Sequence, residues 1–290
     1  MKLLVMTMIG KKIKTKGAIF LPDNIYRGYI EFSGNEDEIN SFMEGLNNED
    51  LYINEYLILH NTTDNKPTEM RWDGNKWVAL NLPKSSYVKG KNSLQRCALD
   101  LLYNKDIPIV AILGTYGSGK TYLAMQMGLY HILEKGNQNK ILGVREAEGE
   151  GKSVGYLKGT FEDKTQLFFK PLEQQLANEK NDLYALQCQG KLDVMIPYYM
   201  KGTTYNDTIM IVDEAEDLSE SQLRLIGTRM GENTRIFFSG DYKQSLRDKT
   251  SNNPLVRMCN EFKGNPLFGC VYLEEDVRSE SSKLFANLFA

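Results

Sequence analysis

The 290-residue sequence has little histidine and no paired cysteines. Its two histidines, His60 and His131, are too few for a histidine-rich metal site and argue against histidine-dependent nucleophilic catalysis. The four cysteines form no Cys-x-x-Cys pair, which argues against a zinc knuckle and a thioredoxin-like redox site. No apolar run approaches the ~20 residues that a transmembrane helix needs. These absences predict a soluble, cytoplasmic protein with reduced thiols and no membrane partner.

The sequence also has no excess of positive charge. Its 35 basic and 38 acidic residues give a net charge of −3, and the isoelectric point is about 5.7. This balance argues against a strongly basic protein that wraps nucleic acid, so any anion site must come from local geometry. The apolar start, residues 1–9, is followed by a cluster of lysines, whereas a signal peptide carries its charge before the apolar run and a small-residue cleavage site after it. We therefore expect a short β-strand there.

The composition changes near residue 88. Residues 1–88 contain short β-branched runs separated by turn signals, and the segment 73–76 (Asp-Gly-Asn-Lys) lies between two apolar runs as in a β-hairpin. We expect a small N-terminal β-rich or α+β module and connector over 1–88. A second domain is expected over 89–290.

The second region has the pattern of an α/β fold. Short, apolar, β-branched segments predict buried strands, and helical patterns lie between them. Strands that alternate with helices predict a mainly parallel sheet with helices on both faces. The expected strands are 107–113, 140–144, 208–212 and 235–239, and the expected helices are 92–103, 120–134 and 219–229.

A glycine-rich loop follows the first of these strands and opens the helix at residue 120. It fits the pattern G-x-x-x-x-G-K-[ST], in which backbone N–H groups and the helix N-terminus face a phosphate. Lys120 would reach the β- and γ-phosphates, and the Thr121 hydroxyl would bind Mg²⁺. The loop therefore predicts a RecA-like P-loop NTPase that uses ATP and Mg²⁺. Its residues are Gly114, Thr115, Tyr116, Gly117, Ser118, Gly119, Lys120 and Thr121.

Two acidic residues end a distant strand. Asp213 and Glu214 follow the apolar segment 208–212, as a Walker B element requires. Because ligands of open α/β sheets lie at the carboxyl ends of the strands, Asp213 is expected beside the metal ion. Glu214 is then the candidate to polarise the attacking water. A glutamate at this position argues against a small-molecule kinase, a third and minor alternative.

A polar segment follows the next expected strand. Gly240 allows a sharp exit from the strand, and Gln244 is an uncharged donor and acceptor that could contact a γ-phosphate or its water. Such a group loses its partner when the phosphate leaves. Gln244 is therefore a candidate sensor of hydrolysis.

In this order, the motifs resemble those of the PhoH-like ATPase family, which is related to superfamily 1 helicases. The resemblance runs from about residue 92 to the end of the chain. It implies that Gln95 reads adenine, that the protein acts on single-stranded RNA or DNA, and that it forms ring-like homo-oligomers such as hexamers. The matching segments are 94–102, 114–121, 144–145, 155–159, 199–207, 212–215, 228–231, 240–244 and 275–278.

Hydrolysis at a P-loop is accelerated by an arginine that meets the charge developing on the γ-phosphate. Arg278 is the favoured candidate, because it occupies a position similar to the Val-Arg motif at the end of the family pattern. Arg229 is a second candidate, and Arg145 and Arg235 are further alternatives. Whether the arginine acts within its own chain or on a neighbour stays open.

The N-terminal region resembles the connector that follows a PIN nuclease domain in some family members. The resemblance covers residues 51–90. The residues before it, about 50, are too few for the PIN fold with its converging carboxylates. We therefore expect an incomplete PIN domain and no nuclease activity from this end.

Two functions from different classes remain open. The first is an ATPase that remodels single-stranded RNA or DNA in a helicase-like manner. The segment 145–205 would bind the substrate, with lysines for contacts to phosphate and tyrosines for stacking. These residues are Lys152, Lys158, Lys164, Lys201, Tyr198 and Tyr199. The alternative is a nucleotide-gated protein-binding module with little hydrolysis. The acidic isoelectric point and Glu146, which replaces the family's usual proline, favour the alternative.

Overall fold

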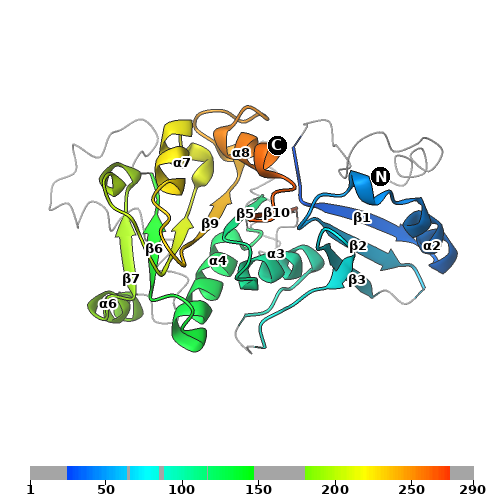
Figure 1. The fold of residues 1–290 in the computed structure, drawn as a ribbon, viewed down its shortest axis with the longest axis horizontal. Helices are drawn as coiled ribbons and strands as arrows, with labels where there is room; N and C mark the ends of the chain where they lie inside the picture. Colours follow the sequence, from blue (N-terminus) through cyan, green and yellow to red (C-terminus); the bar gives the residue numbers. More distant parts are fainter. Residues whose placement is uncertain (1–24, 64–65, 85–87, 116, 147–179, 275–290) are drawn as a thin grey trace.

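The fold is built around two β-sheets, seen side by side in Figure 1. A computed structural model describes residues 25–63, 66–84, 88–115, 117–146 and 180–274. The strand expected over residues 1–9 lies outside these described residues.

The larger sheet has six strands, and all of its strand pairs are parallel. The spatial order is β10-β5-β9-β8-β6-β7. This confirms the predicted α/β fold with its mainly parallel sheet. The six strands are β5 Ile109–Gly114, β6 Lys140–Val144, β7 Leu192–Met195, β8 Thr208–Val212, β9 Arg235–Gly240 and β10 Phe268–Leu273.

Helices cover both faces of this sheet. Figure 1 shows α7 (Glu220–Gly227) and α8 (Pro254–Phe262) on one face, with α3 (Ser93–Tyr103) and α4 (Lys120–Leu129) on the other. The strands are continuously apolar because alternate side chains point to opposite faces. Ile209 and Ile211 of β8 pack in the core with α3 and α4, whereas Met210 and Val212 pack in the core with α7 and α8. A further helix, α6 (Lys180–Cys188), contacts β7.

The helix expected over 120–134 has two parts. After α4, residues Tyr130–Lys135 form a π-helical turn, η2, and Gly136 ends it with a φ of 63°. In this turn His131 is buried, with Nε2 2.9 Å from the carbonyl oxygen of Leu102. A sequence period of 3.6 cannot reveal this wider turn, because the apolar pattern continues through it.

The smaller sheet has the order β1-β2-β3-β4 and forms the module expected at the N-terminal side. Its strands β2, β3 and β4 are antiparallel, whereas β1 pairs with β2 in parallel. The predicted hairpin is confirmed: Asp73 Oδ1 accepts hydrogen bonds from the backbone N–H groups of Asn75 and Lys76. The elements are β1 Tyr29–Gly34, α2 Glu36–Gly45, the 3₁₀ turn η1 Asn48–Asp50, β2 Tyr56–Asn61, β3 Pro67–Trp72 and β4 Trp77–Ala79.

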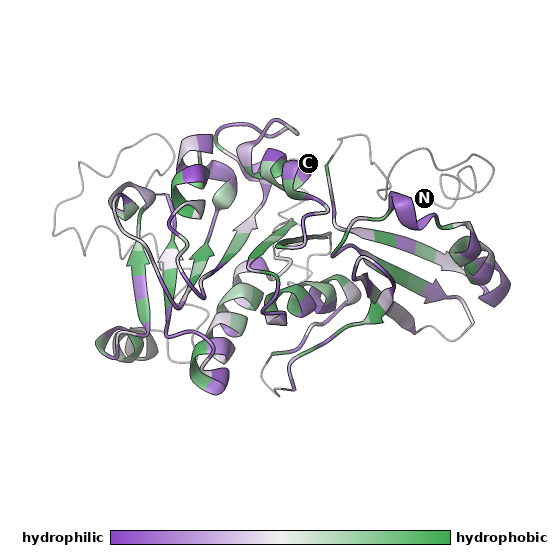
Figure 2. Cartoon of the chain, in the orientation of Figure 1, coloured by the Kyte–Doolittle hydropathy of each residue, from purple (hydrophilic) through white to green (hydrophobic). Residues whose placement is uncertain are grey.

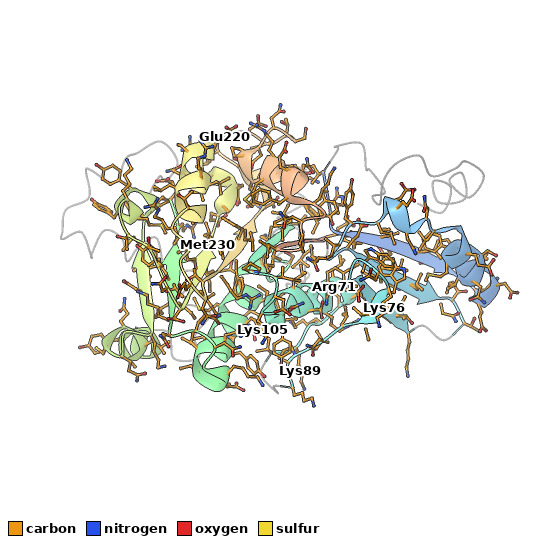
Figure 3. All side chains as sticks on the ribbon, viewed as in Figure 1. Arg71, Lys76, Lys89, Lys105, Glu220 and Met230 are labelled. Atoms are coloured by element: carbon orange, nitrogen blue, oxygen red, sulfur yellow. The ribbon has the colours of Figure 1, made fainter. Side chains whose placement is uncertain are left out.

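The two sheets share one buried interface. One face of the small sheet packs on α2, and Tyr56 and Ile58 on the other face join the core around α3. The buried carboxylate of Asp100 on α3 accepts hydrogen bonds from Tyr56 Oη at 2.7 Å and from Arg71 Nε at 2.9 Å. Figure 3 shows Arg71 where the small sheet meets α3. The packing is continuous across residue 88, and the division into two domains there stays a prediction.

Figure 2 shows hydrophobic strands inside the molecule and hydrophilic residues on the outer parts of the helices. Within the described ranges, every helix is too short or too polar to cross a bilayer.

Candidate functional site

The glycine-rich loop connects β5 to α4, as the sequence predicts. Gly119 is the N-cap residue of α4 and has a φ of 90°, which lies in the left-handed region that favours glycine. A Cβ at Gly119 would also lie 3.0 Å from Gln95 Nε2, and a Cβ at Gly114 would lie 2.2 Å from the carbonyl oxygen of Leu273. The loop therefore depends on glycine for conformation and for space. Tyr116 lies outside the described residues.

The ammonium group of Lys120 lies over this loop. Its Nζ donates hydrogen bonds to the carbonyl oxygens of Gly114 and Thr115, each at 2.9 Å. Burial lowers the pKa of Lys120, while neighbouring carboxylates, that of Asp241 foremost, act in the opposite direction. A half-buried cation at a helix N-terminus is suited to bind an anion such as a phosphate.

Thr121 contacts the carboxylate predicted to bind metal. Its Oγ1 donates to Asp213 Oδ1 at 2.7 Å, although the two residues belong to α4 and the end of β8. Ser239 of β9 joins them: its Oγ donates to the same Oδ1 at 2.7 Å and lies 3.3 Å from Thr121 Oγ1. Ser239 is not among the residues predicted from the sequence, where its one signal is a hydroxyl near the end of the adjacent strand.

These oxygen atoms fit a magnesium ion. Mg²⁺ prefers hard oxygen ligands and is held in nucleotide sites by one or two protein groups together with phosphates and water. Among the described residues there is no group of three or more His, Cys, Asp or Glu side chains that could hold a metal without such phosphates. Thr121 and Asp213 each offer one oxygen atom, which fits a metal ion whose other ligands are nucleotide phosphates and water.

Glu214 is held in an unusual backbone conformation. Its φ of 49° and ψ of 44° are left-handed, a strained region for a residue with a Cβ and one enriched at functional sites. Arg145, which follows β6, contacts both acidic residues: NH1 is 3.4 Å from Asp213 Oδ2, and NH2 is 3.3 Å from Glu214 Oε1. The arginine thus positions the carboxylate that the sequence analysis predicts to activate water.

Glu216 is a second carboxyl group behind this site. It lies in the 3₁₀ turn η5 (Ala215–Asp217), is only 1% exposed, and its Oε2 has no hydrogen-bond partner. Burial, and then the charge of Glu214, raises the pKa of Glu216 to about 9. Gly240 leaves room for it, because a Cβ at Gly240 would lie 2.5 Å from that oxygen. At neutral pH the buried carboxyl is therefore protonated.

This protonation predicts a pH-dependent stability. Glu216 has an ordinary pKa of 4.5, so between pH 4.5 and 9 the folded chain holds a proton that the unfolded chain lacks, and stability falls as pH rises. The slope from one such proton is at most about 1.4 kcal/mol per pH unit. As the pH rises from about 6 to about 9, the Glu216→Gln variant is expected to lose less stability than the unsubstituted protein does. Thermal unfolding at each pH measures this difference.

The control for this prediction is Glu220→Gln, an exposed glutamate at the start of α7 (Figure 3). It should keep the slope of the unsubstituted protein. Some slope should also remain in Glu216→Gln, because burial raises the pKa of Glu55 to about 8. If Glu216→Gln and Glu220→Gln have the same pH dependence, Glu216 is not protonated in the folded protein.

Gln244 lies beyond the end of β9, in the 3₁₀ turn η6 (Tyr242–Gln244). Its Nε2 donates to Asp241 Oδ2, and Asp241 is one of the carboxylates that act on Lys120. The next residue, Ser245, donates from Oγ to the carbonyl oxygen of Glu216 at 2.9 Å. The structure thus places Gln244 at the same edge of the sheet as the P-loop.

Gln95 contacts the P-loop from α3. Its Nε2 donates to the carbonyl oxygen of Ser118 at 2.8 Å, and its Oε1 accepts from the N–H of Lys91 at 2.8 Å. Each amide atom of a glutamine can make one further hydrogen bond. The reading of adenine by Gln95 stays a prediction, and the contact shown here is with the loop itself.

The candidate arginines are not brought together. Arg235 begins β9 and Arg229 follows α7, so both lie near the amino ends of the strands, at the edge opposite the P-loop. The carbonyl of Arg229 accepts a hydrogen bond from Tyr205 N there. Of the three candidates that the structure describes, Arg145 is the one that contacts the two carboxylates, and Arg278 lies outside the described residues.

A parallel sheet with a glycine loop, a lysine, and a threonine–aspartate pair at its carboxyl edge defines the P-loop NTPase class. Residues 87–290 match the model of the PhoH-like protein family, so the chain belongs to that family. Protein PhoH2 of Bacillus subtilis is 33% identical over 209 residues, which cover 69% of this chain and 47% of that protein.

Other relatives agree with this assignment. Protein PhoH2 of Thermobispora bispora is 31% identical over 205 residues, covering 69% of this chain and 47% of that protein. A PhoH-like protein of Synechocystis is 29% identical over 172 residues, covering 59% of this chain and 52% of the relative. The chain thus spans about half the length of the curated relatives that it matches.

Proposed function

We propose that this protein binds ATP with Mg²⁺, hydrolyses it, and couples hydrolysis to binding or remodelling of single-stranded RNA or DNA. The observation that carries the proposal is the 2.7 Å contact between Thr121 Oγ1 and Asp213 Oδ1, beside the ammonium of Lys120. Membership of a P-loop NTPase family supports it. The site joins a phosphate cradle to a metal-binding carboxylate.

Each part of the site has a separate task. Backbone N–H groups of residues 114–121 and the Nζ of Lys120 bind the β- and γ-phosphates. Thr121 and Asp213 hold the metal ion, which neutralises charge on the phosphates when it is bound. The hydrogen bonds that Lys120 makes to the loop are exchanged for bonds to phosphate oxygens, so the cation meets the charge that develops during transfer.

Glu214 accepts the proton of the attacking water. Its side chain is partly exposed, so water can reach it, and Arg145 holds its Oε1. Glu216 is protonated behind it and can donate a hydrogen bond to the Glu214 carboxylate, which orients that group. Gln244 detects the γ-phosphate from the next strand end.

The transition-state arginine is assigned to Arg278, with Arg229 as the second candidate. Within one chain, Arg229 lies at the opposite edge of the sheet. It could therefore act only on the site of a neighbouring copy. A role for Arg229 would therefore require a homo-oligomer, for which we propose a ring such as a hexamer.

The alternative function is a nucleotide-gated module that binds a protein and hydrolyses little ATP. The net charge of −3 favours it. Glu146, the residue after Arg145, also favours it, and its carboxylate accepts a hydrogen bond from Gln222. An acidic group at this edge of the sheet opposes a phosphate backbone. The two functions differ in turnover and in nucleic-acid binding.

Glu214→Gln tests the enzymatic step. The amide cannot accept the proton, so we expect phosphate release to fall at least about 100-fold while ATP affinity stays within about threefold. Phosphate release and equilibrium binding of a fluorescent ATP analogue measure the two effects. Glu220→Gln is the matched control on the surface. If Glu214→Gln releases phosphate at the unsubstituted rate, Glu214 is not the base.

Labelled oligo-uridine and oligo-thymidine distinguish the two functions. The proposed function requires binding at low salt and faster phosphate release with one of them. Absence of binding, together with slow release that no oligonucleotide accelerates, favours the protein-binding alternative.

A further inference from the structure

Two adjacent tyrosines are exposed at the end of the sheet. Tyr198 and Tyr199 lie in the 3₁₀ helix η4 (Pro197–Met200) and are 67% and 50% exposed. Their rings meet edge to face, with centroids 5.2 Å apart, and the Lys201 Nζ lies 5.1 Å from the centre of the Tyr198 ring. We call Tyr198, Tyr199 and Lys201 the tyrosine platform. It combines aromatic rings with a cation, which is the chemistry that binds single-stranded nucleic acid.

The platform stands on a rigid base. Pro197 and Met200, on either side of the tyrosines, are buried, and Met200 belongs to the core that contains Leu223 and Ile226 of α7. Proline also restricts the backbone at the first position of η4. Rings held in place by their backbone lose less freedom when a base stacks on them than rings on a free loop.

The platform lies at the edge of the sheet that carries the nucleotide site. It follows the carboxyl end of β7, next to β6. The backbone N–H of Arg145 lies 3.4 Å from the carbonyl oxygen of Met195, the last residue of β7. Arg145 also contacts Asp213 and Glu214 through its side chain. One residue therefore joins the end of the strand that leads into the platform to the two acidic residues of the site.

A second connection runs through α7, which packs against η4. The first turn of α7 is closed by a capping box between Ser219 and Gln222, and Gln222 Nε2 donates to Glu146, the residue after Arg145. A movement of η4 against α7 would therefore also displace Glu146 and its neighbour Arg145, which contacts Glu214. Both connections run through packed elements, since α7 contacts η4 and β6 pairs with β7.

We propose that the tyrosine platform binds the bases of a single nucleic-acid strand by stacking and that this contact raises the rate of ATP hydrolysis through Arg145. The inference rests on the proposed function and names its substrate-binding surface. Lys201 neutralises a backbone phosphate beside the stacked bases, which supplies a local cation on a chain whose net charge is negative.

The test compares the double substitution Tyr198→Ala and Tyr199→Ala with the unsubstituted protein. We expect oligo-uridine or oligo-thymidine, whichever binds, to bind about tenfold more weakly or worse, measured by fluorescence anisotropy at low salt. Phosphate release without oligonucleotide should stay within about twofold, because neither ring belongs to the nucleotide site, and its acceleration by oligonucleotide should be lost. The double substitution Tyr198→Phe and Tyr199→Phe keeps the stacking faces and should retain both properties.

The matched control is Tyr184→Ala, another exposed tyrosine, on α6 before β7. Two results overturn the inference while the proposed function stands. The first is an equal loss of oligonucleotide binding in Tyr184→Ala and in the platform variant. The second is normal binding and normal acceleration of phosphate release in the platform variant. If the unsubstituted protein hydrolyses ATP but binds neither oligonucleotide, both the inference and the nucleic-acid part of the proposed function are overturned.

Discussion

Replacing Lys120 with alanine is expected to reduce phosphate release at least about 100-fold. The Nζ of Lys120 is the cation that lies over the P-loop, 2.9 Å from the carbonyl oxygens of Gly114 and Thr115. Alanine removes that charge both from bound ATP and from the transition state. In contrast to Glu214→Gln, this variant should therefore also bind ATP more weakly. Phosphate release and binding of a fluorescent ATP analogue measure the two losses.

Lys105→Ala is the matched control for this prediction. Lys105 is an exposed lysine in the turn after α3, before the amino end of β5 and thus at the edge of the sheet opposite the P-loop (Figure 3). Its substitution should change neither quantity by more than about twofold, since surface changes have small effects. Equal phosphate release by Lys120→Ala and Lys105→Ala would refute the assignment of the P-loop as a hydrolytic site.

The parts of the fold that follow from local pattern were predicted well. The strands expected over 140–144 and 208–212 have those bounds in the structure, and β9 extends its prediction by one residue, Gly240. Each is a short β-branched run with polar neighbours, so local pattern alone defines its ends. The pairing order β10-β5-β9-β8-β6-β7 is a long-range property, and no local pattern reports it.

The site was predictable where neighbouring residues act together. The glycine-rich motif is contiguous in sequence between the end of β5 and the start of α4, and the carboxyl edge of a parallel sheet brings Asp213 to Thr121. Ser239 and Glu216 were missed as members of the site, because a serine in a strand and a glutamate in an acidic run look like solvated residues. Their roles come from burial, which depends on the packing of β9, α8 and η5.

Arginines were the hardest residues to interpret. The interpretation of Arg235 as a candidate to meet the γ-phosphate is wrong within one chain. Arg235 begins β9 at the amino edge of the sheet and is only 2% exposed. An arginine side chain extends far enough that its position in sequence does not reveal which groups it binds.

Arg235 is instead a structural cation. NH1 donates to the carbonyl oxygen of Leu102 at 2.7 Å. NH2 lies 2.9–3.1 Å from three further carbonyl oxygens at the end of α3 and in the turn after it. These belong to Leu101, Asn104 and Ile107. Burial lowers the pKa of Arg235 to about 9, so the guanidinium keeps its charge at neutral pH. It binds the carbonyl groups at the helix C-terminus, where negative partial charge gathers, and so connects α3 to the sheet.

Arg235→Ala is therefore expected to lower the free energy of unfolding by about 3 kcal/mol or more, the largest loss of stability predicted. It leaves four carbonyl oxygens, three of them in buried contacts, without this donor, and it opens a cavity beside Phe237, whose ring lies 4.8 Å from the guanidinium. Arg235→Met fills most of the volume but supplies no donors, so it should recover only the cavity part of the loss. Urea unfolding measures all three proteins, with unchanged m values as the sign that two-state behaviour persists.

Arg224→Ala serves as the control, because Arg224 is an exposed arginine on α7 and its loss should change stability by no more than about 0.5 kcal/mol. A loss below about 1 kcal/mol in Arg235→Ala would mean that water replaces the guanidinium at the four carbonyl groups. If Arg235→Met is as stable as the unsubstituted protein, the cavity rather than the hydrogen bonds accounts for the effect. If Arg235→Ala is less stable but releases phosphate normally per folded molecule, the result agrees with the position of Arg235 at the edge of the sheet opposite the nucleotide site.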